Sequence, residues 1–192
     1  MLNPAFAPGS VAVVTGGASG IGLAAATEFA RRGLRVVIAD LGEDRLAHGA
    51  QRIRAAVPAA EVLALEADIS RVEEVRRLEA EVRQRFGGTD VLMNNAGVQP
   101  GSGVLGPAEN WERVLAVNLW GVIHGTQVFV PGMLERGRPG VILNTGSKQG
   151  ITTPPGDPAY NVSKAGVKAF IEALQHELRT TPGCHLSAHL LI

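Results

Sequence analysis

Short apolar runs recur along the chain, and segments with helical periodicity separate them. The runs are rich in Val, Ile, Leu and Ala, and each is apolar throughout, which is typical of parallel strands buried on both faces. They predict strands over residues 11–15, 35–39, 61–65, 90–93, 141–144 and 185–192. The segments between them predict helices over about residues 21–32, 43–56, 71–86, 109–130 and 158–179.

This alternation predicts one fold class. Parallel strands joined by helical, right-handed crossovers form a doubly wound α/β sheet, a Rossmann-like arrangement of three layers, α/β/α. No repeat, linker or low-complexity segment interrupts the pattern. Residues 1–192 are therefore expected to form a single dinucleotide-binding and catalytic domain.

Composition and charge exclude several classes of protein. The 192 residues are 45% hydrophobic, enough for a sizeable core, and 18 Lys and Arg balance 18 Asp and Glu. A protein that binds nucleic acid or an anionic membrane normally carries a basic excess, so we expect neither partner. The start of the chain lacks the basic region of a signal peptide, and the longest apolar stretches are five or six residues, too short for a membrane span.

The cysteine and histidine content bears on redox compartment and metal binding. Cys184 is the single cysteine, so it cannot form an internal disulfide. No His, Cys or acid cluster has metal-ligand spacing, so no metal is expected. The lone thiol favours a reducing, cytoplasmic setting, although a cysteine-poor periplasmic protein would have the same composition.

A glycine-rich turn joins the first predicted strand to the first predicted helix. It has the spacing G-x-x-x-G-x-G, unlike the G-x-G-x-x-G of the ordinary dinucleotide motif. Small residues there let backbone N–H groups approach a pyrophosphate at the helix N-terminus. The candidate cofactor contacts are Gly16, Ser19, Gly20, Ile21 and Gly22. A strand-to-helix turn without a ligand also uses glycine, so the turn alone leaves both interpretations open.

Acidic residues end the second and third predicted strands. Asp40 lies about 20 residues beyond the glycines, where a carboxylate can accept hydrogen bonds from adenosine ribose hydroxyls and repel a 2′-phosphate. Neither Ser19 nor Leu41 is basic, so Asp40 is expected to lack a basic neighbour, and NAD is favoured over NADP. A helix N-cap is the alternative role for Asp40. Asp68 and Ile69 are expected near the adenine, with a turn or cap an equally open role for Asp68.

Further motifs follow in a fixed order. They are Asn94-Asn95-Ala96-Gly97 after the fourth strand, Asn118 in the long helix, Ser147 after the fifth strand, and Tyr160-Asn161-Val162-Ser163-Lys164. With the glycine turn, this set resembles the short-chain dehydrogenase/reductase superfamily, in its branch of single-domain NAD(P)-dependent oxidoreductases. The thirteen residues from Ser147 to Tyr160 agree with that family's pattern, and the resemblance covers essentially residues 10–192.

The resemblance implies roles for these residues. Tyr160 would be the general acid/base, Lys164 its activator and a ribose anchor, and Ser147 the group that holds the substrate oxygen. Asn118 would bend its helix and hold a water that links the lysine to solvent, as a proton relay. The loop after the fourth strand would pack beside the cofactor ribose through Asn95, Ala96 and Gly97.

Part of this chemistry follows from the residues themselves. Tyr160 and Lys164 are four residues apart and so share one helix face. A free tyrosine has a pKa near 10, and a nearby ammonium group favours the phenolate. The phenolate can take an alcohol proton while hydride leaves the same carbon for the nicotinamide. A solvated surface stripe is the alternative for such a pair, and an ordinary turn is the alternative for Ser147.

The main hypothesis is therefore an NAD-dependent oxidoreductase that interconverts a secondary alcohol and a ketone. A non-catalytic module that only binds or senses NAD is the rival from another class, and the intact Ser–Tyr–Lys set argues against it. A sugar-nucleotide epimerase shares the fold, but the glycine spacing and the short chain disfavour it.

Two expectations concern the whole molecule. Family members normally continue beyond the sixth strand into a substrate lid and a seventh strand, so the natural polypeptide is expected to continue for several dozen residues, and the substrate cannot be inferred. The helices at about 109–130 and 158–179 carry apolar residues beyond those that one sheet face should need. We therefore expect a homodimer or homotetramer with an isologous interface that includes Val128, Phe129, Phe170 and Leu174.

Overall fold

The computed structural model describes residues 3–192 and contains one six-stranded parallel sheet. Its strands are β1 (Val11–Thr15), β2 (Arg35–Asp40), β3 (Val62–Glu66), β4 (Val91–Asn94), β5 (Gly140–Thr145) and β6 (Leu186–Leu191), in the order β3-β2-β1-β4-β5-β6. All six lie within one or two residues of the strands predicted from the apolar runs. The Rossmann-like α/β prediction is confirmed.

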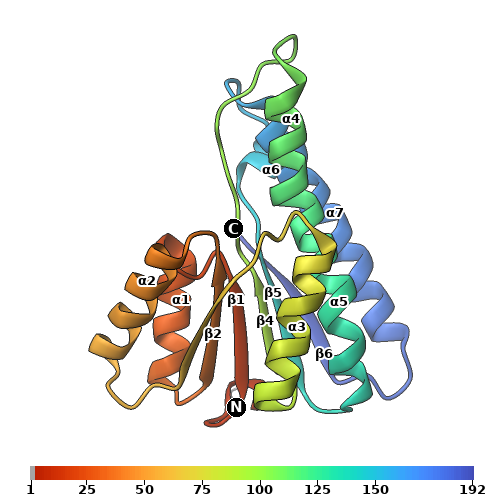
Figure 1. The fold of residues 1–192 in the computed structure, drawn as a ribbon. Helices are drawn as coiled ribbons and strands as arrows, with labels where there is room; N and C mark the ends of the chain where they lie inside the picture. Colours follow the sequence, from red (N-terminus) through yellow and green to blue (C-terminus); the bar gives the residue numbers. More distant parts are fainter. Residues whose placement is uncertain (1–2) are drawn as a thin grey trace.

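Helices cover both faces of the sheet, as Figure 1 shows. They are α1 (Gly20–Arg31), α2 (Glu43–Ala56), α3 (Val72–Phe86), α4 (Ala108–Leu115), α5 (Gly121–Glu135), the short α6 (Gln149–Thr152) and α7 (Pro158–Thr180). A 3-10 turn, Pro4–Phe6, precedes β1. One core lies between the sheet and α1 and α2, and a second lies between the sheet and α3, α5 and α7.

Strand β1 shows why the sequence builds two cores. Successive side chains of a strand point to opposite faces. Val11 and Val13 accordingly join the core under α3, α5 and α7, while Ala12 and Val14 join the core under α1 and α2. Because both faces are covered, every residue of β1 is buried, which explains the uninterrupted apolar run.

The long helix differs from its predicted bounds. It runs without a break from Ala108 to Glu135 instead of ending near 130, and a five-residue π turn, Ala116–Trp120, divides it into α4 and α5. It continues through Pro131 because Val130 and Met133, on either side of the proline, are buried against the sheet. By length and mean hydropathy (1.3) the helix could cross a membrane, but its apolar side chains serve the core of this fold.

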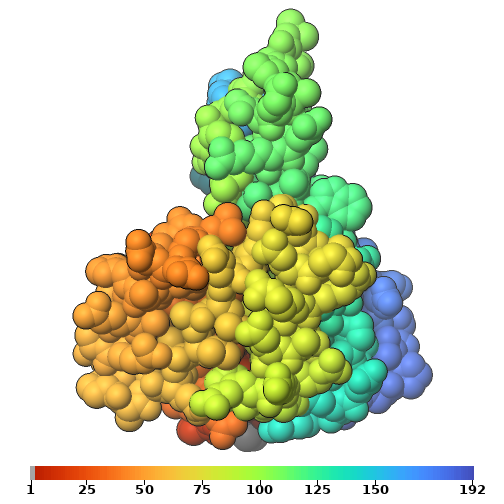
Figure 2. Space-filling view, in the orientation of Figure 1, coloured from red at the N-terminus to blue at the C-terminus, as the bar shows by residue number. Residues whose placement is uncertain are grey.

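The carboxyl edge of the sheet holds the switch in strand order. From β1 the chain passes to β2 on one side, and β4 pairs on the other side. Ligands of open α/β sheets bind at such a point, where the loops diverge. Above this edge, α4, α6 and the start of α7 come together (Figure 1). In the space-filling view, α4 and the segment before it form a lobe that projects beyond the body of the protein (Figure 2).

Candidate active site

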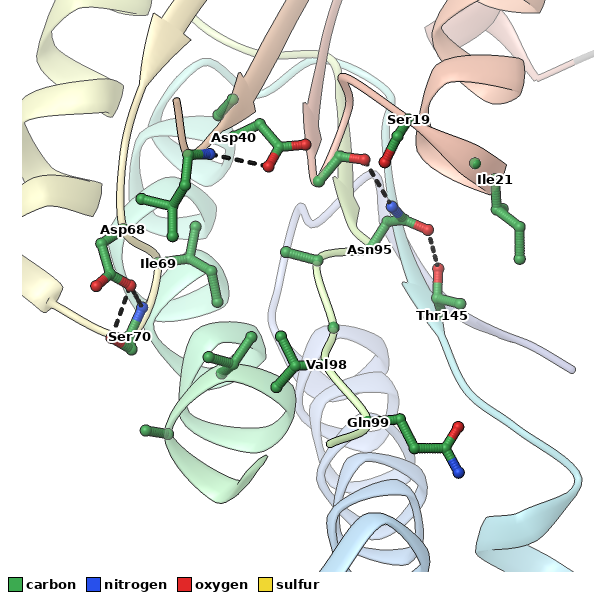
Figure 3. Close-up of a pocket in the computed structure, with 18 of the residues that line it drawn as sticks. Ser19, Ile21, Asp40, Asp68, Ile69, Ser70, Asn95, Val98, Gln99 and Thr145 are labelled. Atoms are coloured by element: carbon green, nitrogen blue, oxygen red, sulfur yellow. Dashed lines mark hydrogen bonds between the residues drawn. The ribbon is translucent and has the colours of Figure 1, made fainter. Parts of the chain in front are cut away.

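A cleft of about 600 Å³ opens at this switch point. It gathers nearly all of the residues expected to bind a cofactor: Gly16, Ser19, Gly20, Ile21, Asp40, Asp68, Ile69, Asn95, Ala96, Gly97, Tyr160 and Lys164 line it. Gly22 lies beneath the lining, in the first turn of α1. Figure 3 shows Asp40 and Asp68 on one side of the cleft and Asn95 with Thr145 on the other.

Two glycines of the turn are required by close packing. Gly16 has φ +64°, and a Cβ atom there would lie 2.7 Å from the Cα of Ala96. A Cβ atom on Gly22 would lie 2.2 Å from the carbonyl oxygen of Gly16. The glycines therefore let the turn sit directly on the loop after β4 and on the start of α1.

The N-terminus of α1 opens towards the cleft. Ser19 occupies the N-cap position in an extended conformation, and its side chain makes no capping hydrogen bond to the helix. The first-turn N–H groups of a helix have no intrahelical partner, and the helix dipole favours negative charge there. Uncapped amide donors in a wall of small residues fit a cofactor diphosphate.

Asn95 ties together the loops that form the floor of the cleft. Its Nδ2 donates to the carbonyl oxygens of Thr15 (3.1 Å) and Gly16 (3.2 Å), and its Oδ1 accepts from the Thr145 hydroxyl (3.0 Å; Figure 3). The Thr15 hydroxyl in turn accepts the N–H of Asn95 at 3.0 Å. Asn95 therefore holds the ends of β1, β4 and β5 in register. The two threonines were not among the residues predicted from the sequence.

Asp40 has a basic neighbour, so that expectation was wrong. The Arg45 guanidinium, in the first turn of α2, forms an ion pair with Asp40, with Nη2 2.8 Å from Oδ1. Oδ1 also accepts the N–H of Leu41 (2.8 Å), and Oδ2 accepts the N–H of Ala18 (3.1 Å). Positions 19 and 41 are not basic, but the turn into α2 brings the basic residue at position 45 back over the strand end. Gly42, and not Asp40, is the N-cap of α2.

Asp68 has the turn role that the sequence left open. Its Oδ1 accepts both the N–H (2.9 Å) and the hydroxyl (2.6 Å) of Ser70. The neighbouring Ile69 is buried, and its carbonyl oxygen lies 3.0 Å from Nδ1 of His124 on α5. Both residues line the same side of the cleft as Asp40 (Figure 3).

Helix α7 carries Tyr160 and Lys164 on one face, as predicted. The Lys164 Nζ lies 5.6 Å from the centre of the Tyr160 ring and donates to the Thr145 carbonyl oxygen at 2.7 Å. Lys164 is only 4% exposed, and this burial lowers its pKa from 10.5 to about 8. The ammonium group is therefore held at the inner wall of the cleft, beneath the tyrosine.

The start of α7 is fixed by two residues that the sequence analysis did not identify. Asp157 is the N-cap, and its Oδ1 accepts the N–H of Tyr160 (3.3 Å) and the hydroxyl of Ser102 (2.5 Å). The Ser102 oxygen accepts the N–H of Ala159 at 2.9 Å. These bonds join the segment after β4 to the helix that presents the tyrosine.

Within residues 3–192, two of the expected catalytic residues are not part of the cleft lining: Ser147 and Asn118. Ser147 is half-buried between β5 and α6, and its hydroxyl oxygen accepts the N–H of Gln149 at 3.1 Å. Asn118 is fully buried in the π turn and bonds to both backbone groups of Val98, at 2.8 and 2.9 Å. Its Nδ2 also lies 3.4 Å from the Ser163 hydroxyl of α7.

Comparison with known proteins decides the family. Residues 10–182 match the family model described as short chain dehydrogenase. The chain belongs to this family. It is 41% identical over 175 residues to the 1-deoxy-11-beta-hydroxypentalenate dehydrogenase of Streptomyces exfoliatus, which covers 88% of this chain and 62% of the relative.

Solved structures agree with this assignment. A short-chain dehydrogenase/reductase from Burkholderia phymatum, in complex with NAD, superposes with a TM-score of 0.91 at 38% identity over 95% of this chain and 64% of that one. A variant of the actinorhodin polyketide ketoreductase, solved with NADPH, gives 0.89 at 35% identity over 96% and 70% of the two chains. The chain thus spans 62% to 70% of the length of these three proteins.

Proposed function

We propose that this short-chain dehydrogenase interconverts a secondary alcohol and a ketone with NAD as its cofactor. The observation that carries the proposal is the buried Lys164 ammonium beneath Tyr160 on the inner wall of the cleft. Bound NAD supplies the hydride acceptor for alcohol oxidation. The uncapped start of α1 would hold its diphosphate, and Asp40 and the Asn95–Gly97 loop would hold its adenosine half.

The residues of this chain handle the proton. In oxidation the Tyr160 oxygen takes the proton of the substrate hydroxyl, and in reduction it returns that proton to the forming alkoxide. The Lys164 ammonium stabilises the phenolate through its positive charge. Thr145, whose carbonyl oxygen accepts from Nζ, keeps the ammonium in place.

Ser147 is proposed to hold the substrate oxygen. Its hydroxyl oxygen already accepts the N–H of Gln149, so its own proton is available for donation. Asn118 is proposed as the relay residue. Because its side chain is bonded to Val98, the relay would use the backbone of the π turn.

Two properties of the whole protein are also proposed. The helices α5 and α7 are expected to pair with the same helices of a second subunit, giving a homodimer or homotetramer. The cytoplasm remains the proposed compartment, on the single free Cys184.

The test is NADH production over a panel of secondary alcohols, alongside calorimetric binding of NAD. Tyr160→Phe should lower kcat at least about 100-fold, the usual size of a general acid–base contribution, with NAD affinity within a few-fold of wild type. Lys164→Met should lose activity as well. Lys168→Met, one turn along α7 and paired with the exposed Glu172, is the matched control and should keep activity.

The same measurements separate the rival function. A protein that binds NAD but oxidises no alcohol, with Tyr160→Phe indistinguishable from wild type, is an NAD-sensing module. A Phe variant that retains more than about a hundredth of the wild-type rate contradicts the acid/base assignment.

A further inference from the structure

Arg45 is a charged residue of the cleft wall to which the proposed mechanism gives no role. It lies in the first turn of α2, lines the cleft beside Asp40, and has about half of its side chain exposed. Its Nη2 lies 2.8 Å from Asp40 Oδ1 in an ion pair and donates to the Leu41 carbonyl oxygen, to which its Nε also donates. Within residues 3–192, its Nη1 makes no hydrogen bond, so this end of the guanidinium is available.

The ion pair limits what Asp40 can accept. A carboxylate oxygen accepts about two hydrogen bonds. Oδ1 receives one, from Leu41 N–H, and has the Arg45 Nη2 atom 2.8 Å away in the ion pair, whereas Oδ2 receives one, from Ala18 N–H. The Arg45 ion pair therefore occupies the position beside Oδ1 that a second donor would need, and a pair of ribose hydroxyls would compete with Arg45 for it.

The same pair weakens the exclusion of a 2′-phosphate. Asp40 repels a phosphate through its negative charge, and the Arg45 guanidinium at 2.8 Å offsets that charge. A phosphate beside Asp40 would also find the Nη1 donors, and arginine binds phosphate through such charge-assisted bonds.

We infer that Arg45 is a second determinant of cofactor choice, which lowers the preference of this cleft for NAD over NADP. Asp40 favours the free ribose, while Arg45 both competes with that ribose and attracts the phosphorylated one. The inference deepens the proposed function and rests on it, because it concerns the adenosine end of the same cofactor site.

The test uses two fragments that differ only at the ribose 2′ position, adenosine 5′-monophosphate and adenosine 2′,5′-bisphosphate, each titrated into the protein by calorimetry at about 50 mM salt. Arg45→Ala should weaken bisphosphate binding about tenfold, the effect of one lost charge-assisted hydrogen bond, and leave monophosphate binding unchanged or tighter. Arg52→Ala removes the same charge from α2, two turns farther along, and should leave the ratio of the two affinities within twofold.

A double-mutant cycle isolates the pair. Asp40→Ala should tighten bisphosphate binding, because it removes the repulsion and frees Arg45, and the gain should largely disappear in Asp40→Ala/Arg45→Ala. An unchanged affinity ratio in Arg45→Ala, or an equal change in Arg52→Ala, overturns the inference while leaving the proposed function intact. If neither fragment binds wild type, the proposed cofactor site itself is wrong, and the inference fails with it.

Discussion

At the scale of single residues, burial of the Lys164 ammonium group costs free energy of folding. Its Nζ has one backbone acceptor and an aromatic face nearby, and no carboxylate bonds to it within residues 3–192. Burial without a counter-charge favours the neutral amine, which is why its pKa falls to about 8. Keeping an ammonium group beside Tyr160 therefore lowers the free energy of unfolding of the protein.

This burial predicts a pH-dependent stability. In the unfolded chain Lys164 keeps its proton up to about pH 10.5, whereas in the folded chain it releases the proton from about pH 8. Between these values the unfolded state binds more protons, so raising the pH favours folding. From pH 7 to pH 9, the free energy of unfolding of wild type should rise by about 1 kcal/mol relative to Lys164→Met, as measured by urea denaturation. The Lys168→Met control should show the same rise in the free energy of unfolding as wild type. If the difference between wild type and Lys164→Met does not change from pH 7 to pH 9, the prediction is refuted.

The sequence predicted the residues of the cleft better than their partners. Motif residues such as Asp40, Asn95 and Lys164 lie at strand ends or on one helix face. Spacing along the chain is enough to predict those positions. Their partners are Arg45, in the first turn of α2, and the backbone or hydroxyl groups of Thr15 in β1 and Thr145 in β5. The tertiary fold brings the two threonines to the cleft, whereas the Asp40–Arg45 pair depends on how the chain turns into α2, so spacing along the chain predicts neither.

At the scale of elements, the N-terminus of α7 links structure to the proposed chemistry. Asp157 caps the helix at Tyr160 and also receives the Ser102 hydroxyl, so one carboxylate fixes both the helix start and the loop that covers it. It is 7% exposed, and its Oδ2 has no partner within residues 3–192.

Removing this cap should loosen the helix that carries the tyrosine. Asp157→Ala should lower the free energy of unfolding by about 2 kcal/mol, from the lost cap and the lost bond to Ser102, and should lower kcat with little change in NAD affinity. Asp157→Asn keeps an acceptor oxygen at the cap and should cost less than half as much. Denaturant titration with parallel kinetics measures both, and equal losses in the two variants would contradict the capping role.

Element boundaries show where sequence periodicity stops being informative. The strands were predicted closely because full burial makes each one uninterruptedly apolar. The end of α5 was missed because Pro131 and Gly132 suggest a stop, while packing of Met133 on the sheet overrides that local preference. The π turn at Asn118 was anticipated only as a bend inferred from the family resemblance.

At the scale of the whole molecule, the apolar residues offered for subunit pairing divide into two groups. Phe129 is 2% exposed and belongs to the core beneath α5, so it is not surplus to the sheet, contrary to the expectation. Val128, Phe170 and Leu174 are partly buried and keep some surface for a partner.

If α5 and α7 pair across an isologous interface, light scattering at micromolar concentration should give a mass at least twice 20.1 kDa. Val128→Lys places a charge on each side of such an interface and should shift the mass to that of one chain. Circular dichroism checks that the variant is folded. A wild-type mass of one chain would contradict the prediction.

The strand order has a consequence for how the protein is made. On a ribosome, β1, β2 and β3 emerge with α1 and α2 and can bury most of one core within the first 66 residues. The other edge of β1 must wait for β4, which begins 80 residues after the start of β1. Until β4 docks, the nascent sheet has an unpaired apolar edge, and the cleft that lies between these two strands does not yet exist. A cofactor therefore cannot stabilise this early half-domain by binding, because its site forms only when β4 pairs with β1.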